Sequence, residues 1–308
     1  MRRAGALLLL LLATTLVGGC TRTGSLEGAI DASVGAKASP EAAATPAAEG
    51  APESTVGVAS SYATEDGTDG AGPFGEEARA EGGSGFEADT LLAVRHGLHG
   101  GFERVVLDLG AGEEPAVAVP RWTLDRSEGD GLLRVNFPSA NATAVSDGAL
   151  GEGLLEDFHV VRAPEGGMFL DVLARQGFRY RVLELAEPAR LVVDFRPAGA
   201  APKEPPPAKG GETVLVEPRA GAEISDPLTV SGYSRNFEAA NTIVLENGSG
   251  ETLVRKTVIA NDWSSTWGYF ESTLNLPRLP EKGTLIVGTR SARDGSFEGV
   301  EIPVRGGG

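Results

Sequence analysis

The sequence has little of what enzyme active sites and disulfide-stapled domains are built from. Its 308 residues include one cysteine, three histidines and 6% aromatic residues. A single cysteine excludes an intrachain disulfide, and three histidines leave little room for a catalytic triad or a zinc site. The sequence also has no Gly-x-Ser-x-Gly elbow, no phosphate-binding loop and no Cys-x-x-Cys pair. These absences predict a protein that is not an enzyme and that uses no cofactor.

Positive charge is also scarce. The chain has 27 basic residues against 43 acidic ones, a formal net charge of -16. Phosphate backbones and anionic lipid headgroups repel such a chain, so we expect no nucleic-acid partner and no electrostatic binding to membranes, except through a local basic patch. The apolar run near the N-terminus is shorter than the roughly 20 residues that a membrane-spanning helix requires.

The first twenty residues have the three parts of an export signal. Arg2 and Arg3 are positive, residues 6–17 are apolar, and two glycines precede Cys20. This stretch resembles the lipobox of bacterial lipoproteins, although that family prefers leucine where Val17 stands. The resemblance implies a signal peptide over 1–19 and a lipid, including palmitate, on Cys20, which would anchor an extracytoplasmic protein to the cell membrane. The alternative is a plain secretory signal with an incidental cysteine.

Residues 20–88 are rich in alanine, glycine, proline and acidic residues, and they contain almost no large apolar side chains. Such a segment cannot bury enough surface to offset its chain entropy, so we predict a disordered tether. It would either give the protein reach into the cell wall or simply link the anchor to a domain.

Short apolar or alternating runs, separated by glycine, proline and acidic turns, fill residues 89–197 and predict a β-sandwich domain. The expected strands are 91–95, 104–109, 132–137, 158–162, 168–173, 178–185 and 190–195. Two of them share the pattern Arg, three apolar residues, Asp, apolar residue. We predict that these two strands are antiparallel neighbours, with Arg104 opposite Asp194 and Arg190 opposite Asp108.

A proline-rich linker is expected over 198–211, followed by a second sandwich over 212–305 of about immunoglobulin size. Its expected strands are 213–216, 228–233, 242–246, 252–259, 269–276, 284–289 and 300–304. The fold class is therefore all-β, with two β-sandwich domains after a tether.

Each domain resembles a known family. Residues 94–108, 178–183 and 188–194 carry the similarity of the first to the AMIN-like domains of bacterial envelope lipoproteins. That resemblance implies a non-catalytic module that positions an envelope protein, often by contact with peptidoglycan. Residues 216–218, 227–232, 237–238, 267–270 and 291–296 make the second domain similar to the immunoglobulin-like domain of spore-germination proteins, the Gmad family. In that family the domain commonly accompanies a germination module, which we do not find here, so the domain alone implies no germination role.

Two candidate binding surfaces stand out. Arg175, Arg179 and Arg181 with Tyr180 form a local basic and aromatic patch, suited to carboxylates of peptide stems or of an acidic partner. Alternatively, these arginines pair with acids of their own domain, such as Asp171 and Glu184.

The second candidate surface is on the strand that begins at Trp267. Alternation sends Phe270, Leu274 and Leu276 inward and leaves Trp267 and Tyr269 outside, as a sugar-stacking or protein-contact face. The alternative places Trp267 in the core through a bulge at Gly268.

The histidines give no metal site. His96 and His99 have ligand-like spacing, but residues three apart on a strand lie on opposite faces, and no third ligand is evident. A turn at Gly97 would be needed to bring them together. His159 lies in an apolar strand, where we expect a packed or hydrogen-bonded side chain.

Together these patterns predict a non-enzymatic, membrane-anchored envelope lipoprotein that binds peptidoglycan or a wall-associated protein. The alternative is a structural interaction module of a multiprotein envelope or sporulation complex without glycan binding.

Overall fold

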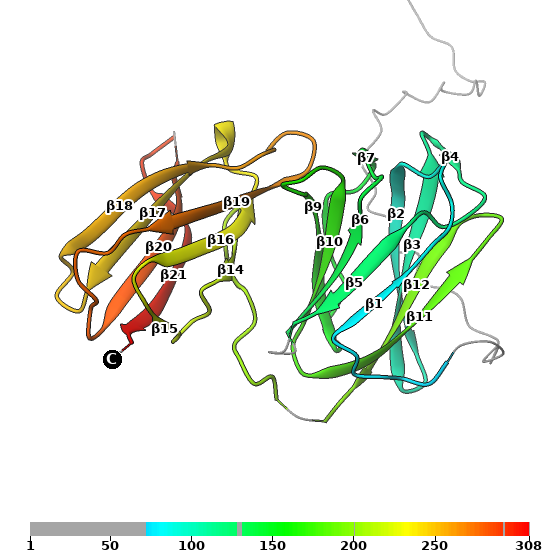
Figure 1. The fold of residues 1–308 in the computed structure, drawn as a ribbon, viewed down its shortest axis with the longest axis horizontal. Coiled ribbons are helices and arrows are strands. Elements are labelled where there is room, and N and C mark those ends of the chain that lie inside the picture. Colours follow the sequence, from blue (N-terminus) through cyan, green and yellow to red (C-terminus); the bar gives the residue numbers. More distant parts are fainter. Residues whose placement is uncertain (1–71, 128–130, 200, 292, 308) are drawn as a thin grey trace, which may run out of the picture. The chain divides into compact units, whose positions relative to one another are not determined.

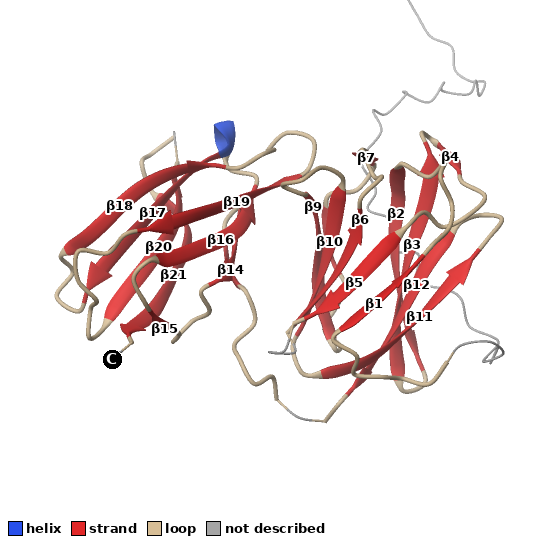
Figure 2. Ribbon diagram, viewed as in Figure 1, coloured by secondary structure: helices blue, strands red, loops and turns tan. Residues whose placement is uncertain are grey.

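The two regions of alternating apolar residues each form a β-sandwich in the computed structural model (Figure 1; Figure 2). The structure describes residues 72–127, 131–199, 201–291 and 293–307. Cys20, the predicted signal peptide and the predicted tether up to residue 71 lie outside the described residues. Within the described ranges no helix has the length and apolar character needed to cross a membrane.

In the first sandwich, two antiparallel sheets enclose a core of leucine, valine and aromatic side chains. One sheet consists of β11 (Phe178–Leu185), β12 (Arg190–Pro197), β3 (Phe102–Ala111), β2 (Thr90–His99), β7 (Ala142–Thr143) and β4 (Glu114–Pro115). The facing layer consists of β1 (Arg79–Gly82), β5 (Trp122–Arg126), β6 (Leu132–Phe137), β10 (Met168–Ala174), β9 (Leu155–Arg162) and β8 (Asp147–Ala149). All seven predicted strands of this domain are present.

The predicted pairing of the two similar strands is confirmed. β3 and β12 are antiparallel neighbours, with Arg104 opposite Asp194 and Asp108 opposite Arg190. Between these polar positions, Val105, Leu107, Leu191 and Val193 point into the core. The strands pair in this register because a slip by one residue would turn the whole apolar set toward solvent.

The first domain begins earlier than predicted. Residues 72–88, expected to be disordered tether, include β1, which pairs with β5, and the buried Ala88. Gly75 forms an isolated antiparallel bridge with Tyr180 at the edge of β11. The prediction failed here because small and polar residues can form an edge strand that contributes little to the core.

In the second sandwich, two layers enclose a separate core that includes Leu215, Ile243, Phe270, Leu285 and Val287. One layer consists of β13 (Ala208–Gly210), β14 (Thr213–Glu217), β16 (Leu228–Ser234) and β19 (Trp267–Leu274). The other consists of β15 (Glu223–Ile224), β21 (Phe297–Gly306), β20 (Gly283–Arg290), β17 (Ala240–Asn247) and β18 (Thr252–Ile259), with the short turn η1 (Phe237–Ala239) before β17. Each of the seven strands predicted for this domain is present, and β13 places its start inside the predicted linker.

The sheets of the two sandwiches are joined. β19 of the second domain pairs in parallel with β9 of the first through Trp267 opposite Val161 and Gly268 opposite Arg162. One ten-stranded sheet therefore runs through both domains.

Candidate functional site: a basic and aromatic face on the first sandwich

The outer face of the β11–β12–β3 sheet collects arginines from three strands. Because alternate residues of a strand point to opposite sides, the polar positions of these strands share one face while their partners fill the core. At one end of the sheet this arrangement forms a cluster that we call the basic–aromatic face. Its members are His99, Phe102, Arg104, Arg179, Arg181 and Arg196, and Phe74 of the segment before β1 packs on it.

A buried carboxylate holds two of these arginines in place. Asp194 is fully buried and accepts hydrogen bonds from Arg104 Nε at 2.6 Å and Nη2 at 2.9 Å. Arg181 Nε donates at 2.8 Å to Oδ2 of the same carboxylate, the oxygen that also accepts from Arg104 Nη2. The hydrogen bond to Asp194 also raises the pKa of Arg104. One negative charge thus fixes two positive ones, which leaves this part of the sheet with an excess of positive charge.

Aromatic rings pack between the guanidinium groups. The Arg181 guanidinium carbon lies 4.5 Å from the ring centre of Phe74 and 5.3 Å from that of Phe102, and Arg196 lies 4.2 Å from Phe74. His99 stacks on Phe102 with a centroid distance of 4.7 Å and an interplanar angle of 3°. Burial, followed by the charge of Arg104, lowers the pKa of His99. The cluster offers both charge and flat apolar surface to a ligand.

The positive charge continues along the same face. Arg190 lies opposite Asp108, and Arg95 Nε donates to Asp108 at 2.6 Å. The outer face of β2, β3, β11 and β12 therefore carries six arginines against two aspartates, in a protein whose formal net charge is -16. The six are Arg95, Arg104, Arg179, Arg181, Arg190 and Arg196.

Only part of the predicted basic patch lies on this face. Arg179 and Arg181 do, but Tyr180 points to the inner side, is 3% exposed and donates its hydroxyl to the carbonyl of Glu77 at 3.0 Å. Arg175 lies beyond the end of β10, where its guanidinium donates to the carbonyls of Gly153 and Leu155. The expectation that Arg175 and Tyr180 belong to one exposed patch is wrong, because alternation separates neighbours in sequence.

Arg179 and Arg181 do pair with acids of their own domain, as the alternative predicted, but the acids are not Asp171 and Glu184. Arg179 Nε donates to Glu76 at 2.7 Å, and Arg181 pairs with Asp194. Asp171 instead pairs with Arg134, and Glu184 accepts hydrogen bonds from the Trp122 indole and the Gly83 amide.

The first two histidines lie on opposite faces of β2. His96 points inward and pairs with Glu103 at 2.9 Å, while His99 is on the outer face. Within the ranges that the structure describes, no group of three or more His, Cys, Asp or Glu side chains is placed to hold a metal ion.

The second candidate surface is covered by the chain itself. Phe270, Leu274 and Leu276 point into the core of the second sandwich, as predicted, and Trp267 and Tyr269 lie on the other face. That face is not exposed: Trp267 is 5% exposed and packs with Tyr233 and Val214 of its own domain and with Val161 and Phe169 of the first. Exposure of Trp267 was therefore a wrong expectation. The alternative, in which a bulge at Gly268 turns Trp267 into the core of the second sandwich, is also wrong, because the indole lies outside that core.

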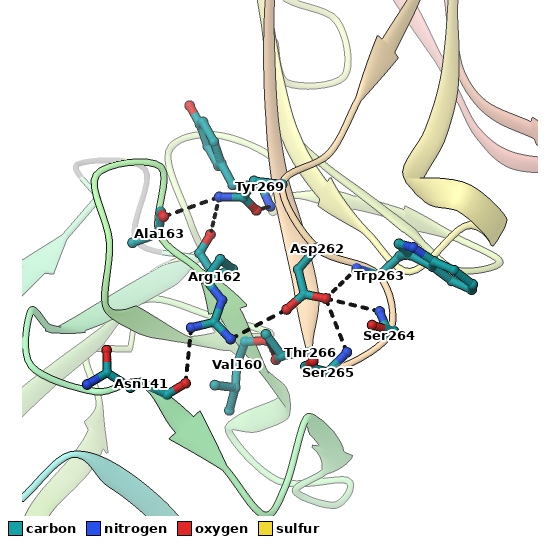
Figure 3. A network of polar contacts seen from close by, with 11 residues as sticks. Asn141, Val160, Arg162, Ala163, Asp262, Trp263, Ser264, Ser265, Thr266 and Tyr269 are labelled. Carbon is teal, nitrogen blue, oxygen red and sulfur yellow. Dashed lines mark hydrogen bonds and ion pairs between the residues drawn. The ribbon is translucent and has the colours of Figure 1, made fainter.

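Polar contacts seal this junction (Figure 3). Asn261 donates to the carbonyls of Arg162 and Ala163 at 3.1 and 3.2 Å, and Arg162 pairs with Asp262 at 3.5 Å. Asp262 also accepts the backbone N–H groups of the next three residues, 263–265, which fixes the loop before β19. Gly268 is required there, because a Cβ atom would overlap the backbone of Asp262.

Tyr269 lies at the edge of the junction. Its hydroxyl donates to Glu271 at 2.6 Å, and its ring contacts that of Phe169. Burial and the hydrogen bond to Glu271 raise its pKa to about 12, so the phenol stays neutral and remains a hydrogen-bond donor at physiological pH.

His159 of β9 is the packed histidine that the sequence predicts. It is 7% exposed, and its ring lies 4.7 Å from Trp267 and 5.3 Å from Tyr233. Burial lowers its pKa, although nearby carboxylates act in the opposite direction.

Acidification should weaken the protein through His159. With a folded-state pKa below the unfolded value of about 6.5, the unfolded chain binds more protons between the two values. We therefore expect the free energy of unfolding to fall as the pH drops below about 6.5, and His159→Gln to reduce that fall. Urea denaturation at pH 7.5 and pH 5 measures both slopes. Equal slopes in wild type and His159→Gln would contradict the assignment.

Comparison with known families supports the predicted immunoglobulin-like character of the second domain. The Gmad2 family model, which describes the immunoglobulin-like domain of bacterial spore germination, matches residues 213–296. This match runs from the start of β14 to the turn before β21 and confirms the predicted resemblance for that domain. The comparisons with curated proteins and with solved structures found no match.

The sequence did not single out His99, Phe102, Arg104 and Arg196 as members of a site, nor Phe74 as a residue that packs on them. Arg104 could have been found, because the repeated Arg and Asp pattern places it opposite Asp194. Arg181 lies opposite Asp194 on the other side of β12. Phe74 gave no such signal, because nothing in the acidic, glycine-rich segment around it predicts a strand.

Proposed function

We propose that this chain is a non-enzymatic, lipid-anchored protein of the bacterial cell envelope whose first domain binds an acidic wall partner through the basic–aromatic face. The partner is peptidoglycan, through the carboxylates of its peptide stems, or a wall-associated protein with acidic side chains. The leader and Cys20 support the anchor, and the AMIN-like motifs support the envelope role.

One observation carries the proposal. An acidic protein places six arginines and two aspartates on one sheet face, and the two arginines next to Phe102 are held in fixed orientation by Asp194. Arginine's planar fork binds carboxylates with two parallel hydrogen bonds, and adjacent rings add contact area for a sugar or peptide. Ion pairing with the domain's own acids does not require this density of arginine on one face.

Co-sedimentation of the full chain with purified sacculi tests the proposal. Arg179→Gln with Arg196→Gln removes two exposed guanidinium groups while leaving the Asp194 pairs intact, and we expect binding to weaken by about tenfold or more. Raised salt should weaken wild-type binding as well. The control is Arg255→Gln with Arg305→Gln, which makes the same charge change at exposed sites of the second domain. Equal binding by both double variants would contradict the proposed site.

A second candidate function is a protein-contact module, favoured by an exposed aromatic pair on the second domain. Phe237 and Trp263 are 67% and 38% exposed, with ring centres 5.3 Å apart. Glu238 and Ala239 beside them adopt left-handed backbone at φ 56° and 58°, a strained conformation for residues other than glycine. This reading keeps the envelope or sporulation setting but needs no glycan affinity.

A further inference from the structure

The basic–aromatic face is partly covered by the chain's own N-terminal segment. Residues 74–77, which we call the N-terminal strap, lie along the edge of β11. Phe74 packs on Arg181 and Arg196, and Glu76 pairs with Arg179. The strap thus contacts three of the four arginines of the face with an aromatic ring and a carboxylate.

The strap has the chemistry that the face would recognise in a partner. A ring over two guanidinium groups and a carboxylate on a third are the contacts that we expect from an aromatic or sugar ring and an acidic group of a ligand. The covering is effective, because the Arg181 side chain is only 10% exposed although it lies on an outer sheet face.

Few contacts hold the strap against the first sandwich. Its backbone forms one bridge with β11, between Gly75 and Tyr180, with N···O distances of 2.9 and 3.0 Å. Two further backbone carbonyls, those of Glu76 and Glu77, accept hydrogen bonds at 3.0 Å from the Arg126 guanidinium and the Tyr180 hydroxyl. The Glu76–Arg179 pair is 53% exposed on both sides, a kind of ion pair that contributes little to stability. Phe74 is not part of the hydrophobic core of the first sandwich. Short segments at the start of a domain that make few contacts open at low cost.

We propose that the N-terminal strap is an intramolecular competitor for the basic–aromatic face. With the strap in place, Arg179, Arg181 and Arg196 are engaged by Phe74 and Glu76; a ligand gains full access only when the strap leaves. The apparent affinity for an acidic ligand is then reduced by the fraction of molecules whose face is free. This inference rests on the proposed function, since it concerns access to the same face.

The first test needs no ligand. Phenylglyoxal modifies accessible arginines, and peptide mass spectrometry gives a rate for each one in the full chain. In Phe74→Ala with Glu76→Gln, we expect Arg181 and Arg196 to be modified several-fold faster than in wild type, and Arg190 at an unchanged rate. Phe86→Ala with Glu87→Gln is the matched control: it removes the same side-chain types at exposed positions outside the strap. Unchanged rates at Arg181 and Arg196 in a folded strap variant would overturn the proposal.

The second test uses a fluorescein-labelled hexaglutamate peptide and fluorescence anisotropy. Loss of the competitor should tighten its binding by about threefold to tenfold in the strap variant and leave the control unchanged. Weaker binding would make Phe74 part of the binding platform and would overturn the proposal. Glu76→Gln alone, which keeps the Phe74 ring, should raise the Arg179 rate, so the idea is testable even if Phe74→Ala impairs folding. If sacculi do not bind but the arginine rates change as expected, the proposed function fails and the strap stands.

Discussion

Trp267→Ala should lower the free energy of unfolding by about 3–5 kcal/mol, the range for truncating a buried tryptophan. The indole is 5% exposed, lies among Val161, Phe169, Val214 and Tyr233, and donates to Asp147 at 3.0 Å. Its loss leaves a cavity between the two sandwiches and removes a hydrogen bond to Asp147 Oδ2, which keeps those from Ser146 and Arg235. Urea denaturation followed by far-UV circular dichroism measures the change.

Trp263→Ala is the matched control for this prediction. Trp263 is 38% exposed and contacts Phe237, so its loss should cost no more than about 1 kcal/mol. Comparable effects of the two substitutions would mean that the junction around Trp267 contributes little to folding.

The second large effect is expected at Asp194. Asp194→Asn removes the charge that holds Arg104 and Arg181, and we expect the free energy of unfolding to fall by roughly 3 kcal/mol, as for other broken buried pairs. Breaking a buried ion pair costs about 3–5 kcal/mol. We expect the lower end of this range because the Arg104 side chain is 31% exposed and can be solvated once the pair is lost.

Asp108→Asn makes the same substitution at the equivalent position of the neighbouring strand. The Arg95 and Asp108 side chains are 40% and 25% exposed, so this pair should contribute less than about 1 kcal/mol. If Asp194→Asn is as mild as Asp108→Asn, the buried carboxylate does not organise the basic–aromatic face.

Local pattern predicted seven strands in each sandwich and one long-range pairing. The register of β3 and β12 followed from two segments that each place Arg and Asp on one side and apolar residues on the other. The strand β5 was missed, since its five residues mix Trp122 and Leu124 with polar neighbours and have no long apolar run. Strand β1 was missed for the same reason.

The alternation of apolar and polar residues predicted which face of a sheet a side chain lies on, but not which residues cover that face. Alternation separated Trp267 from Phe270 correctly, yet the cover over Trp267 is Val161 and Phe169 of the other domain, more than ninety residues away in sequence. In the same way, Arg179 and Arg181 were identified, while Glu76 and Phe74 reach them through a fold that no local spacing encodes.

The two surfaces now differ in what they offer a partner. Side chains of the first domain cover Trp267 on β19, so this ring is not accessible to an external ligand. On the basic–aromatic face, Arg179 of the edge strand β11 and Arg196 of its neighbour β12 lie opposite each other and are exposed. We therefore propose this face as the point of contact with the envelope.

Arginine modification of the full chain with and without purified sacculi tests that claim most directly. We predict that sacculi slow the phenylglyoxal reaction of Arg104 and Arg179 while Arg255 and Arg305 of the second domain react as before. Unchanged rates at Arg104 and Arg179 in protein that co-sediments with sacculi would place the contact elsewhere and contradict the account.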